Sequence, residues 1–472
     1  MHPLARLDHR HLWHPFTQMR DWLQREPILI VSGQGTVLRD VQGREYLDAN
    51  ASIWTNLHGH NHPTINAAIQ RQLKKIAHSS ALGLANEPAS LLGEKLIRAA
   101  HPPSAVRQPQ LAKVFFSDDG STAMEVALKL AYEFARRAGR SQNPKFLSLS
   151  GAYHGDTVGA VSLGHIDRFH KAYAGLLFKS DQVMSPYCYR CPFNRAKPER
   201  ADARDYRKCH WECVGKVEGQ FTRQKRKGNP YAAMVVEPLI QGAAGMIPHP
   251  PGWLSRIAEI VRADGAQLIA DEVLTGFGRT GIANPEMLFA CHREGVQPDF
   301  LALAKGLTGG YLPMAATLTT QAVFDAFLGK YAEFKTFFHG HSYTANQLGA
   351  AAALASLDIL RSPASLRARQ NLQQALQDAL PLLWSLSQVG DIRQVGLIVG
   401  VELVKDWRTR EPFDLRERAG IRVCEEMARR GVLTRPIGNV VVLMPPYCTT
   451  PQQAERMVAA LGAAVAKVLN RQ

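Results

Sequence analysis

The sequence has no apolar run long enough to cross a membrane. Within its 472 residues, no stretch comes near the roughly 20 consecutive apolar residues that a membrane-spanning helix requires. The N-terminal residues MHPLARLDHRHLWHPFTQMRDW also lack the apolar segment of a secretion signal. We therefore expect a protein that neither enters a membrane nor is exported.

Cysteine is scarce as well, with seven residues in the whole chain. An odd number spread over this length does not make a disulfide scaffold, and it suits the reducing cytoplasm. Two pairs lie close in sequence, Cys188 with Cys191 and Cys209 with Cys213, and their spacing resembles that of a zinc knuckle. The sequence leaves two interpretations open, a structural zinc site and a surface insertion of reduced thiols.

Acidic residues are too few to balance the basic ones. Against 56 Lys and Arg the chain has 41 Asp and Glu, which gives a net charge of +15. The basic residues are spread along the chain, dense only between Arg195 and Arg226, and no recognition motif accompanies them. We expect no nucleic-acid partner. A basic, zinc-stabilised nucleic-acid-binding protein is the alternative from another functional class, and salt-dependent binding to DNA or RNA would reveal it.

What the sequence does contain is an alternation of short apolar runs with helical patterns. The runs predict strands at residues 113–117, 145–149, 232–237, 267–273 and 300–304. Strands that alternate with helices indicate an α/β fold with a mostly parallel central sheet and helices on both faces. We expect a large domain over residues 58–345, with the cysteine-containing insertion at about 186–215.

The C-terminal part has a different order of predicted helices and strands. A long helical pattern covers residues 345–383, and strands follow near 396–404 and 439–444. This pattern predicts a smaller α+β domain over residues 346–472. Residues 1–57 have no alternation of their own, so we expect them to dock on the small domain.

Two charged residues mark a candidate site. Lys305 follows the apolar run FLAL and precedes glycines, and burial there would lower its pKa, as a nucleophilic lysine requires. Asp271 ends the run QLIAD, so it lies at the carboxyl edge of a parallel sheet, where it can hold a protonated pyridine nitrogen. Taken alone, Lys305 also fits a lysine whose amine reaches solvent, and Asp271 fits a helix cap.

A phosphate cradle is the third candidate feature. Gly120 and Ser121 follow the strand KVFFS and open a helix, whose backbone N–H groups and dipole attract an anion. Tyr153, in GAYHGDT, is a loop aromatic residue that can stack on a cofactor ring. An ordinary N-cap and an ordinary packing residue are the alternative interpretations.

Six segments together resemble one family. They are SDDGSTAMEVALKLA, GAYHGDTVGAVSLG, EPLIQGAAGM, DEVLTGFGRTG, PDFLALAKGLTGGYLPMAATL and FFHGHSYTANQLG. Their order and spacing are similar to the class III, fold type I aminotransferases, which use pyridoxal 5'-phosphate. HLWHPFTQM and LTRPIGNVVVLMPPY are similar to a narrower group, the 8-amino-7-oxononanoate aminotransferases of biotin biosynthesis. The resemblance runs from about His11 to Tyr447.

The resemblance implies a reaction. A ping-pong transamination would convert 8-amino-7-oxononanoate to 7,8-diaminononanoate, with S-adenosylmethionine or lysine as amino donor. The family also implies a homodimer with shared active sites. A general ω-amino acid or diamine aminotransferase of the same class is the alternative, and it need not keep the motifs at the two ends of the chain.

The resemblance also implies roles for single residues. Lys305 would attach the cofactor aldehyde and move the substrate proton, and Asp271 would pair with the pyridine nitrogen. Val273 and Tyr153 would cover the two ring faces, with Tyr153 also touching substrate, and Trp54 would line the substrate pocket. The remaining implied contacts are to phosphate (Gly120, Ser121 and, from the second subunit, His341 and Ser342), to the substrate channel (Gly340) and to the substrate carboxylate (Arg435).

Three departures from the family pattern concern the amino donor. Phe16 stands where S-adenosylmethionine-using members have Tyr, Ile53 where they have the first Trp of a pair, and Ile437 where they have Phe. These changes look closer to the branch that uses lysine. The sequence therefore leaves the donor open.

Overall fold

The computed structural model describes residues 1–101, 110–281 and 287–469. Its centre is a seven-stranded sheet in the order β4-β12-β11-β10-β7-β5-β6. The strands are β4 (Leu111–Ser117), β5 (Lys145–Leu149), β6 (Asp181–Val183), β7 (Tyr231–Val236), β10 (Gln267–Asp271), β11 (Phe300–Leu303) and β12 (Ala315–Thr320).

The predicted parallel sheet is confirmed. Parallel pairs join β6, β5, β7, β10 and β11, whereas β12 runs antiparallel to both β11 and β4. The five predicted strands all exist, within two residues of their expected ends. The sequence patterns did not predict β6 or β12. The antiparallel strand of this sheet, β12, was therefore found only in the structure.

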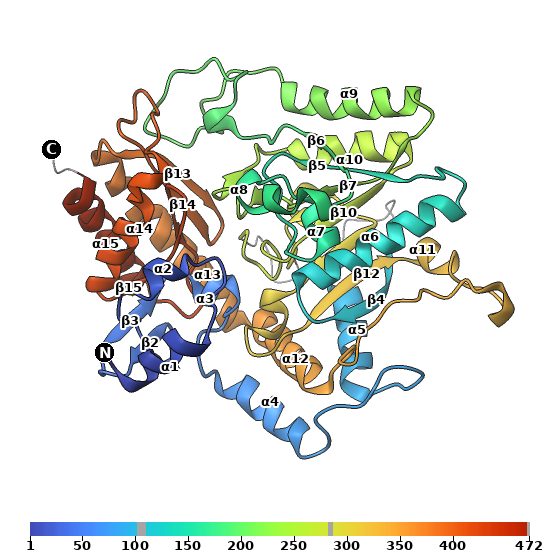
Figure 1. Cartoon of the computed structure of the whole chain (residues 1–472), viewed down its shortest axis with the longest axis horizontal. Helices are drawn as coiled ribbons and strands as arrows, with labels where there is room; N and C mark the ends of the chain where they lie inside the picture. The colour runs from blue at the N-terminus through green and yellow to red at the C-terminus, as the bar shows by residue number, and fades with distance from the viewer. Residues whose placement is uncertain (102–109, 282–286, 470–472) are drawn as a thin grey trace.

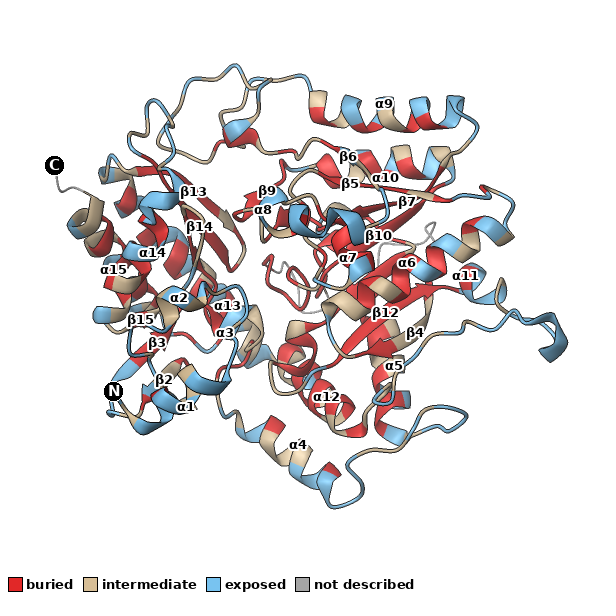
Figure 2. Ribbon diagram, viewed as in Figure 1, coloured by how far each residue is buried: buried red, intermediate tan, exposed pale blue. Residues whose placement is uncertain are grey.

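Helices cover both faces of this sheet because successive side chains of a strand point to opposite sides. Ile269 of β10 packs in a cluster with α6, whereas its neighbours Leu268 and Ala270 pack in the larger cluster with α10. Figure 2 shows the strands buried between helices that are exposed on their outer sides. The helices of this domain are α4 (Pro63–Leu73), α5 (Glu87–Ala99), α6 (Gly120–Arg137), α7 (Val158–Leu163), α8 (Asp167–His170), α9 (Glu212–Arg226), α10 (Trp253–Asp264), α11 (Gln321–Asp325) and α12 (Gln347–Arg361).

A second, smaller unit lies beside the large one (Figure 1). Its antiparallel sheet contains β13 (Val389–Val395), β14 (Ile398–Leu403), β17 (Val440–Leu443) and β16 (Pro436–Ile437). It also contains α14 (Ala419–Arg429) and α15 (Pro451–Leu469). With the large parallel sheet, this α+β unit completes the predicted fold class.

The expected long helix of residues 345–383 is two helices. α12 ends at Arg361, and α13 (Pro363–Ala379) begins after a break. Ser362 caps α13 through its side chain, and Pro363 occupies the first turn, where a missing backbone N–H costs nothing. The apolar periodicity continues through the break, so the pattern alone merged the two helices.

The two ends of the chain share a sheet. β1 (Ile30–Gln34), β2 (Val37–Asp40) and β3 (Glu45–Asp48) form antiparallel pairs, and β15 (Val432–Leu433) joins β3 in parallel. The short helices α1 (Pro3–His11), α2 (Met19–Trp22) and α3 (Ala51–Trp54) accompany this sheet, and β8 (Ile240–Gln241) pairs with β9 (Ile247–Pro248) elsewhere. The N-terminal segment thus contacts the small unit through backbone hydrogen bonds. None of the helices in the described residues is both long and apolar enough to cross a membrane.

Candidate active site

A cavity of about 720 Å³ opens along the carboxyl edge of the central sheet. The strands β4, β7, β10 and β11 end beside it, and a polar residue at or just beyond the end of each strand lines it, namely Asp118, Glu237, Asp271 and Lys305. Parallel strands direct their carboxyl ends to one edge, so residues far apart in sequence meet here. Of the predicted site residues, this cavity brings together Trp54, Gly120, Ser121, Tyr153, Asp271, Val273 and Lys305.

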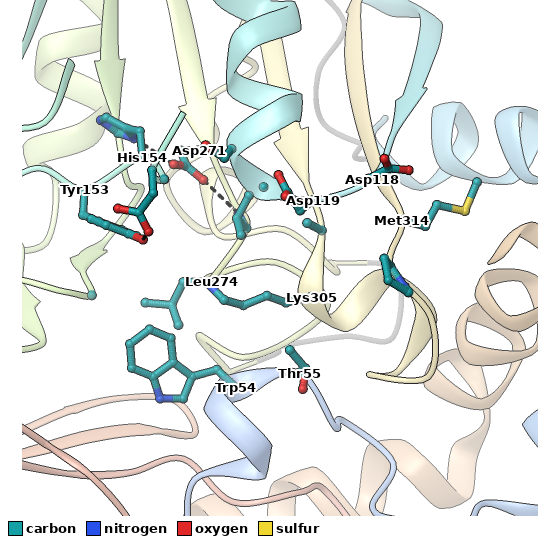
Figure 3. Close-up of a pocket in the computed structure, with 18 of the residues that line it drawn as sticks. Trp54, Thr55, Asp118, Asp119, Tyr153, His154, Asp271, Leu274, Lys305 and Met314 are labelled. Atoms are coloured by element: carbon teal, nitrogen blue, oxygen red, sulfur yellow. Dashed lines mark hydrogen bonds and ion pairs between the residues drawn. The ribbon is translucent and has the colours of Figure 1, made fainter. Parts of the chain in front are cut away.

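Lys305 extends into the cavity between Asp271 and Trp54 (Figure 3). Burial lowers the pKa of its amine, and the charges of Asp271 and then Glu237 oppose that shift. Its backbone has a φ of +42°, a conformation that costs a non-glycine residue of order 1 kcal/mol or more. Its Nζ lies 5.2 Å from the centroid of the Trp54 ring. The surroundings thus favour the neutral amine that a nucleophilic lysine needs.

Asp271 is held by a histidine that the sequence motifs did not single out. Nδ1 of His154 lies 2.7 Å from Oδ2 of Asp271, and the backbone N–H of Val273 donates to Oδ1 at 3.1 Å. Burial lowers the pKa of His154, but the hydrogen bond and charge of Asp271 outweigh it, and the net shift is upward. His154 therefore fixes the orientation of the Asp271 carboxyl group. The residues are separated by 117 positions, so no local pattern indicated the pair.

The residues predicted to form a phosphate cradle lie at the start of α6, as the sequence indicated. The helix begins at Gly120, and the side chain of Asp119 accepts the N–H of Thr122 in a capping box. Oγ of Ser121 lies 2.8 Å from Oγ1 of Thr157 and accepts the Thr157 N–H at 2.9 Å. The first-turn N–H groups of a helix have no partner within it and attract anions. The structure adds Thr157 to the predicted cradle.

Glycines allow the chain to approach closely here. A Cβ on Gly120 would lie 2.7 Å from Cγ1 of Val273, and one on Gly155 would lie 2.4 Å from Oγ of Ser121. Neither separation is possible without movement of backbone or of a branched side chain. The two glycines therefore allow Val273 and the loop after β5 to pack directly against the start of α6.

Tyr153 lies on the other side of the cavity from Asp118 and Asp119 (Figure 3). Its hydroxyl donates to Oδ2 of Asp156 at 2.7 Å. Burial, together with this bond, raises the pKa of Tyr153, so the phenol stays neutral. A neutral aromatic face is suited to stacking on a ring.

Glu237 is a second residue that the sequence reasoning missed. Its Oε1 accepts the N–H of Tyr153 at 3.3 Å, and Oε2 accepts the N–H of Gly242 at 2.8 Å. Burial raises the pKa of Glu237 to about 7. The motif EPLIQGAAGM contained the residue, but only its position directly after β7 places it in the cavity.

Four predicted residues lie elsewhere in the single chain. Arg435, Gly340, His341 and Ser342 are not among the described residues that line the cavity. His341 lies near its margin, because its Nδ1 is 3.3 Å from Oδ2 of Asp118. Arg435 is exposed, two residues beyond β15.

The four cysteines of the insertion converge. Cys188, Cys191, Cys209 and Cys213 line one small enclosed cavity, and all are free thiols. Burial raises the pKa of Cys188 to about 12 and that of Cys213 to about 11. In the part of the chain that the structure describes, no group of three or more His, Cys, Asp or Glu side chains is arranged to hold a metal ion. The four thiols lie close together, and both interpretations of the insertion, a zinc site and a group of reduced thiols, stay open predictions.

The residues present suit pyridoxal phosphate. Asp271 is held in place by His154 and can pair with a pyridine nitrogen, Lys305 is desolvated for an aldehyde, and Gly120 and Ser121 offer donors for a phosphate. Val273 and Tyr153 lie within the same cavity. Fold and site together define a fold type I enzyme that uses pyridoxal phosphate.

Comparison with known proteins gives the family. The family model "Aminotransferase class-III" matches residues 19–465. An adenosylmethionine-8-amino-7-oxononanoate aminotransferase of Geobacter sulfurreducens is 47% identical, over 96% of this chain and 95% of that protein. The crystal structure of the enzyme so named from Methanocaldococcus jannaschii is 38% identical, with a TM-score of 0.88 over 98% of this chain and 99% of that one. An amine transaminase of an uncultivated Pseudomonas species, solved with pyridoxal phosphate bound, is 34% identical with a TM-score of 0.85, over 97% of this chain and 98% of that one. The chain belongs to the class III aminotransferases.

Proposed function

We propose that this aminotransferase transfers an amino group to the ketone of 8-amino-7-oxononanoate and forms 7,8-diaminononanoate. The observation that carries the proposal is the cavity in which Lys305 and Asp271 meet the cradle at Gly120 and Ser121. Support for the substrate comes from the relatives named above and from the motifs at the two ends of the chain.

Each residue has a task in this reaction. Bound pyridoxal phosphate supplies an electron sink that stabilises negative charge on the substrate carbon. Asp271 would keep a proton on the pyridine nitrogen, and His154 would hold Asp271 in place through its hydrogen bond. Lys305 Nζ would take the proton from the substrate carbon and return it in the opposite half-reaction. Tyr153 and Val273 would hold the ring between them, and Trp54 would line the substrate side of Lys305.

We also propose that the enzyme is a homodimer in which each site is completed by the partner. Exposed large apolar side chains are frequent between residues 324 and 343, the segment that contains Gly340, His341 and Ser342. They are Phe324, Leu328, Tyr331, Phe334, Phe338 and Tyr343. Exposed apolar surface of this kind is typical of a protein interface. The free thiols support a reducing compartment, the cytoplasm.

The substrate proposal has a direct test. Purified protein loaded with pyridoxal phosphate is given 8-amino-7-oxononanoate with S-adenosylmethionine or with lysine, and 7,8-diaminononanoate is measured by mass spectrometry. Formation with one donor supports the proposal and identifies that donor. If neither donor gives product while other ω-amino acids or diamines are converted, the enzyme is the general aminotransferase of this class.

A further inference from the structure

We propose that Glu237 is the binding subsite for the ammonium group that 8-amino-7-oxononanoate carries on the carbon next to its ketone. This inference rests on the proposed function and gives it a specificity-determining residue. Glu237 would select an α-amino ketone over a simple ketone of the same length.

The first argument is that Glu237 is a buried acid without a cationic partner. It is 5% exposed, and its oxygens accept the backbone N–H groups of Tyr153 and Gly242. Among the described residues, no basic side chain forms an ion pair or a hydrogen bond with it. Acidic side chains are rarely buried unless they are paired. A cation in the cavity would supply that missing partner.

The second argument compares the other acids of the cavity, which already have partners. Asp271 is bound by His154, and Asp118 faces His341 at 3.3 Å. Asp119 caps the start of α6, and Asp156 is exposed and accepts the hydroxyl of Tyr153. Glu237 differs from Asp271, Asp118 and Asp156 because only backbone N–H groups bind it, and it differs from Asp119, which is exposed, because it is buried. It is the cavity acid with capacity left for a ligand.

The third argument is its position relative to the reacting atoms. Burial lowers the pKa of Lys305, and the charges of Asp271 and Glu237 raise it. The charge of Glu237 therefore acts on the Lys305 amine. Glu237 lies within electrostatic reach of this amine, which must come close to the ketone carbon of the substrate to move its proton. In 8-amino-7-oxononanoate the ammonium group is one bond away from that ketone. His154, Asp271 and Lys305 are the other titratable groups that face this point.

The chemistry of the pairing is favourable. Burial raises the pKa of Glu237 to about 7 because its charged form has lost water. An ammonium group beside the carboxylate would replace that water with a charge-assisted hydrogen bond, which is worth more than a neutral one. A ketone without the amine leaves the acid uncompensated, so the site rejects it.

The test compares two acceptors. The first is 8-amino-7-oxononanoate, and the second is 7-oxononanoate, which has the same chain, carboxylate and ketone but no amine. We expect the wild-type enzyme to prefer the first by about 10- to 100-fold in kcat/KM, the range for a lost hydrogen bond to a charged group. In Glu237→Gln the preference should fall to within about threefold, chiefly through a loss of kcat/KM for the amino ketone. Glu237→Asp, which retains the charge, should keep part of it.

Controls separate this effect from general damage. Asp156→Asn removes an acid of the same cavity that already has a partner, and the preference ratio should stay within twofold of wild type. The donor half-reaction of Glu237→Gln, followed by absorbance without any ketone, should keep its rate within about threefold, since neither lysine nor S-adenosylmethionine carries an ammonium group on a carbon next to the reacting one.

Two outcomes would overturn the inference. One is a wild-type enzyme that uses both ketones equally well. This outcome is measured on the wild-type enzyme alone and does not depend on whether a variant folds. The other is a Glu237→Gln enzyme with the full wild-type preference. A wild-type enzyme that converts neither ketone with either donor would instead refute the proposed function, so the two failures are distinct.

Discussion

The bond between His154 and Asp271 gives the sharpest prediction. The side chains of both are buried, at 0% and 6% exposure, and Nδ1 and Oδ2 lie 2.7 Å apart. Phenylalanine in place of the histidine would fill the space of the imidazole ring without offering a donor to Asp271. In His154→Phe the carboxylate of Asp271 would keep only the backbone N–H of Val273. Asp271 would then be held less firmly in the position from which it pairs with the pyridine nitrogen.

The size of the effect follows from the kind of bond. Removing one hydrogen bond to a charged group costs roughly 1.5 to 3 kcal/mol. At 1.36 kcal/mol for each factor of ten, the expected loss is about 10- to 150-fold in kcat, accompanied by weaker cofactor binding. His154→Asn should lose less, since an amide nitrogen can occupy the position of Nδ1 and donate to Oδ2.

The dependence on pH has a definite sign. Asp271 raises the pKa of His154 above its ordinary value, although burial opposes the shift. The interaction therefore stabilises the folded enzyme fully below that ordinary value, near 6.5, and is lost as the pH rises through the higher folded-state pKa. The stability advantage of wild type over His154→Phe, from denaturant unfolding, should be largest below pH 6.5 and shrink in alkaline buffer.

The assay needs a control for the loss of a buried imidazole. His249 is also buried, and within the described residues neither of its ring nitrogens has a hydrogen-bond partner. His249→Phe should therefore leave kcat and cofactor affinity within about threefold of wild type. A His154→Phe enzyme that matches His249→Phe in kcat, and in the cofactor Kd from absorbance titration, would refute the reasoning.

Three further predictions concern the cofactor and the dimer. Lys305→Ala should lower kcat by about 10⁴-fold, the upper range for general acid–base catalysis, and a visible cofactor band that survives this change would contradict the assigned lysine. Gly120→Ala places a Cβ 2.7 Å from Val273, so the cofactor Kd should rise by about tenfold as overpacking costs 1 to 3 kcal/mol, and Val273→Ala should reverse the rise. Lys305→Ala and His341→Ala subunits, each poorly active, should regain part of the wild-type activity on mixing, since one site of a mixed dimer has both residues. Mixtures that stay as inactive as their components, although exchange is seen by mass spectrometry, would argue against shared sites.

The sequence indicated those features that depend on local pattern. Lys305 and Asp271 follow apolar strand runs, and the end of a parallel strand is also the edge of a sheet, so local spacing placed both residues near one site. Gly120 and Ser121 open a helix after a strand, which is another local signal. The helical pattern of residues 345–383 was misleading because apolar periodicity does not register a single break at Ser362 and Pro363.

Other features needed the tertiary structure, because their partners come from distant parts of the chain. His154 meets Asp271 across 117 residues, and Leu47 pairs with Val432 across the two ends of the chain. In the sequence, Glu237 looks like any acidic residue that follows a strand. The structure shows that it is buried and that it accepts hydrogen bonds from two backbone N–H groups but has no cationic partner among the described residues. The sequence spacing of the four cysteines predicted that they lie close together. Whether their thiols can surround a metal ion depends on side-chain directions, which the spacing does not determine. Local pattern determined which residues can do chemistry, and burial and long-range packing decided which charges those residues carry.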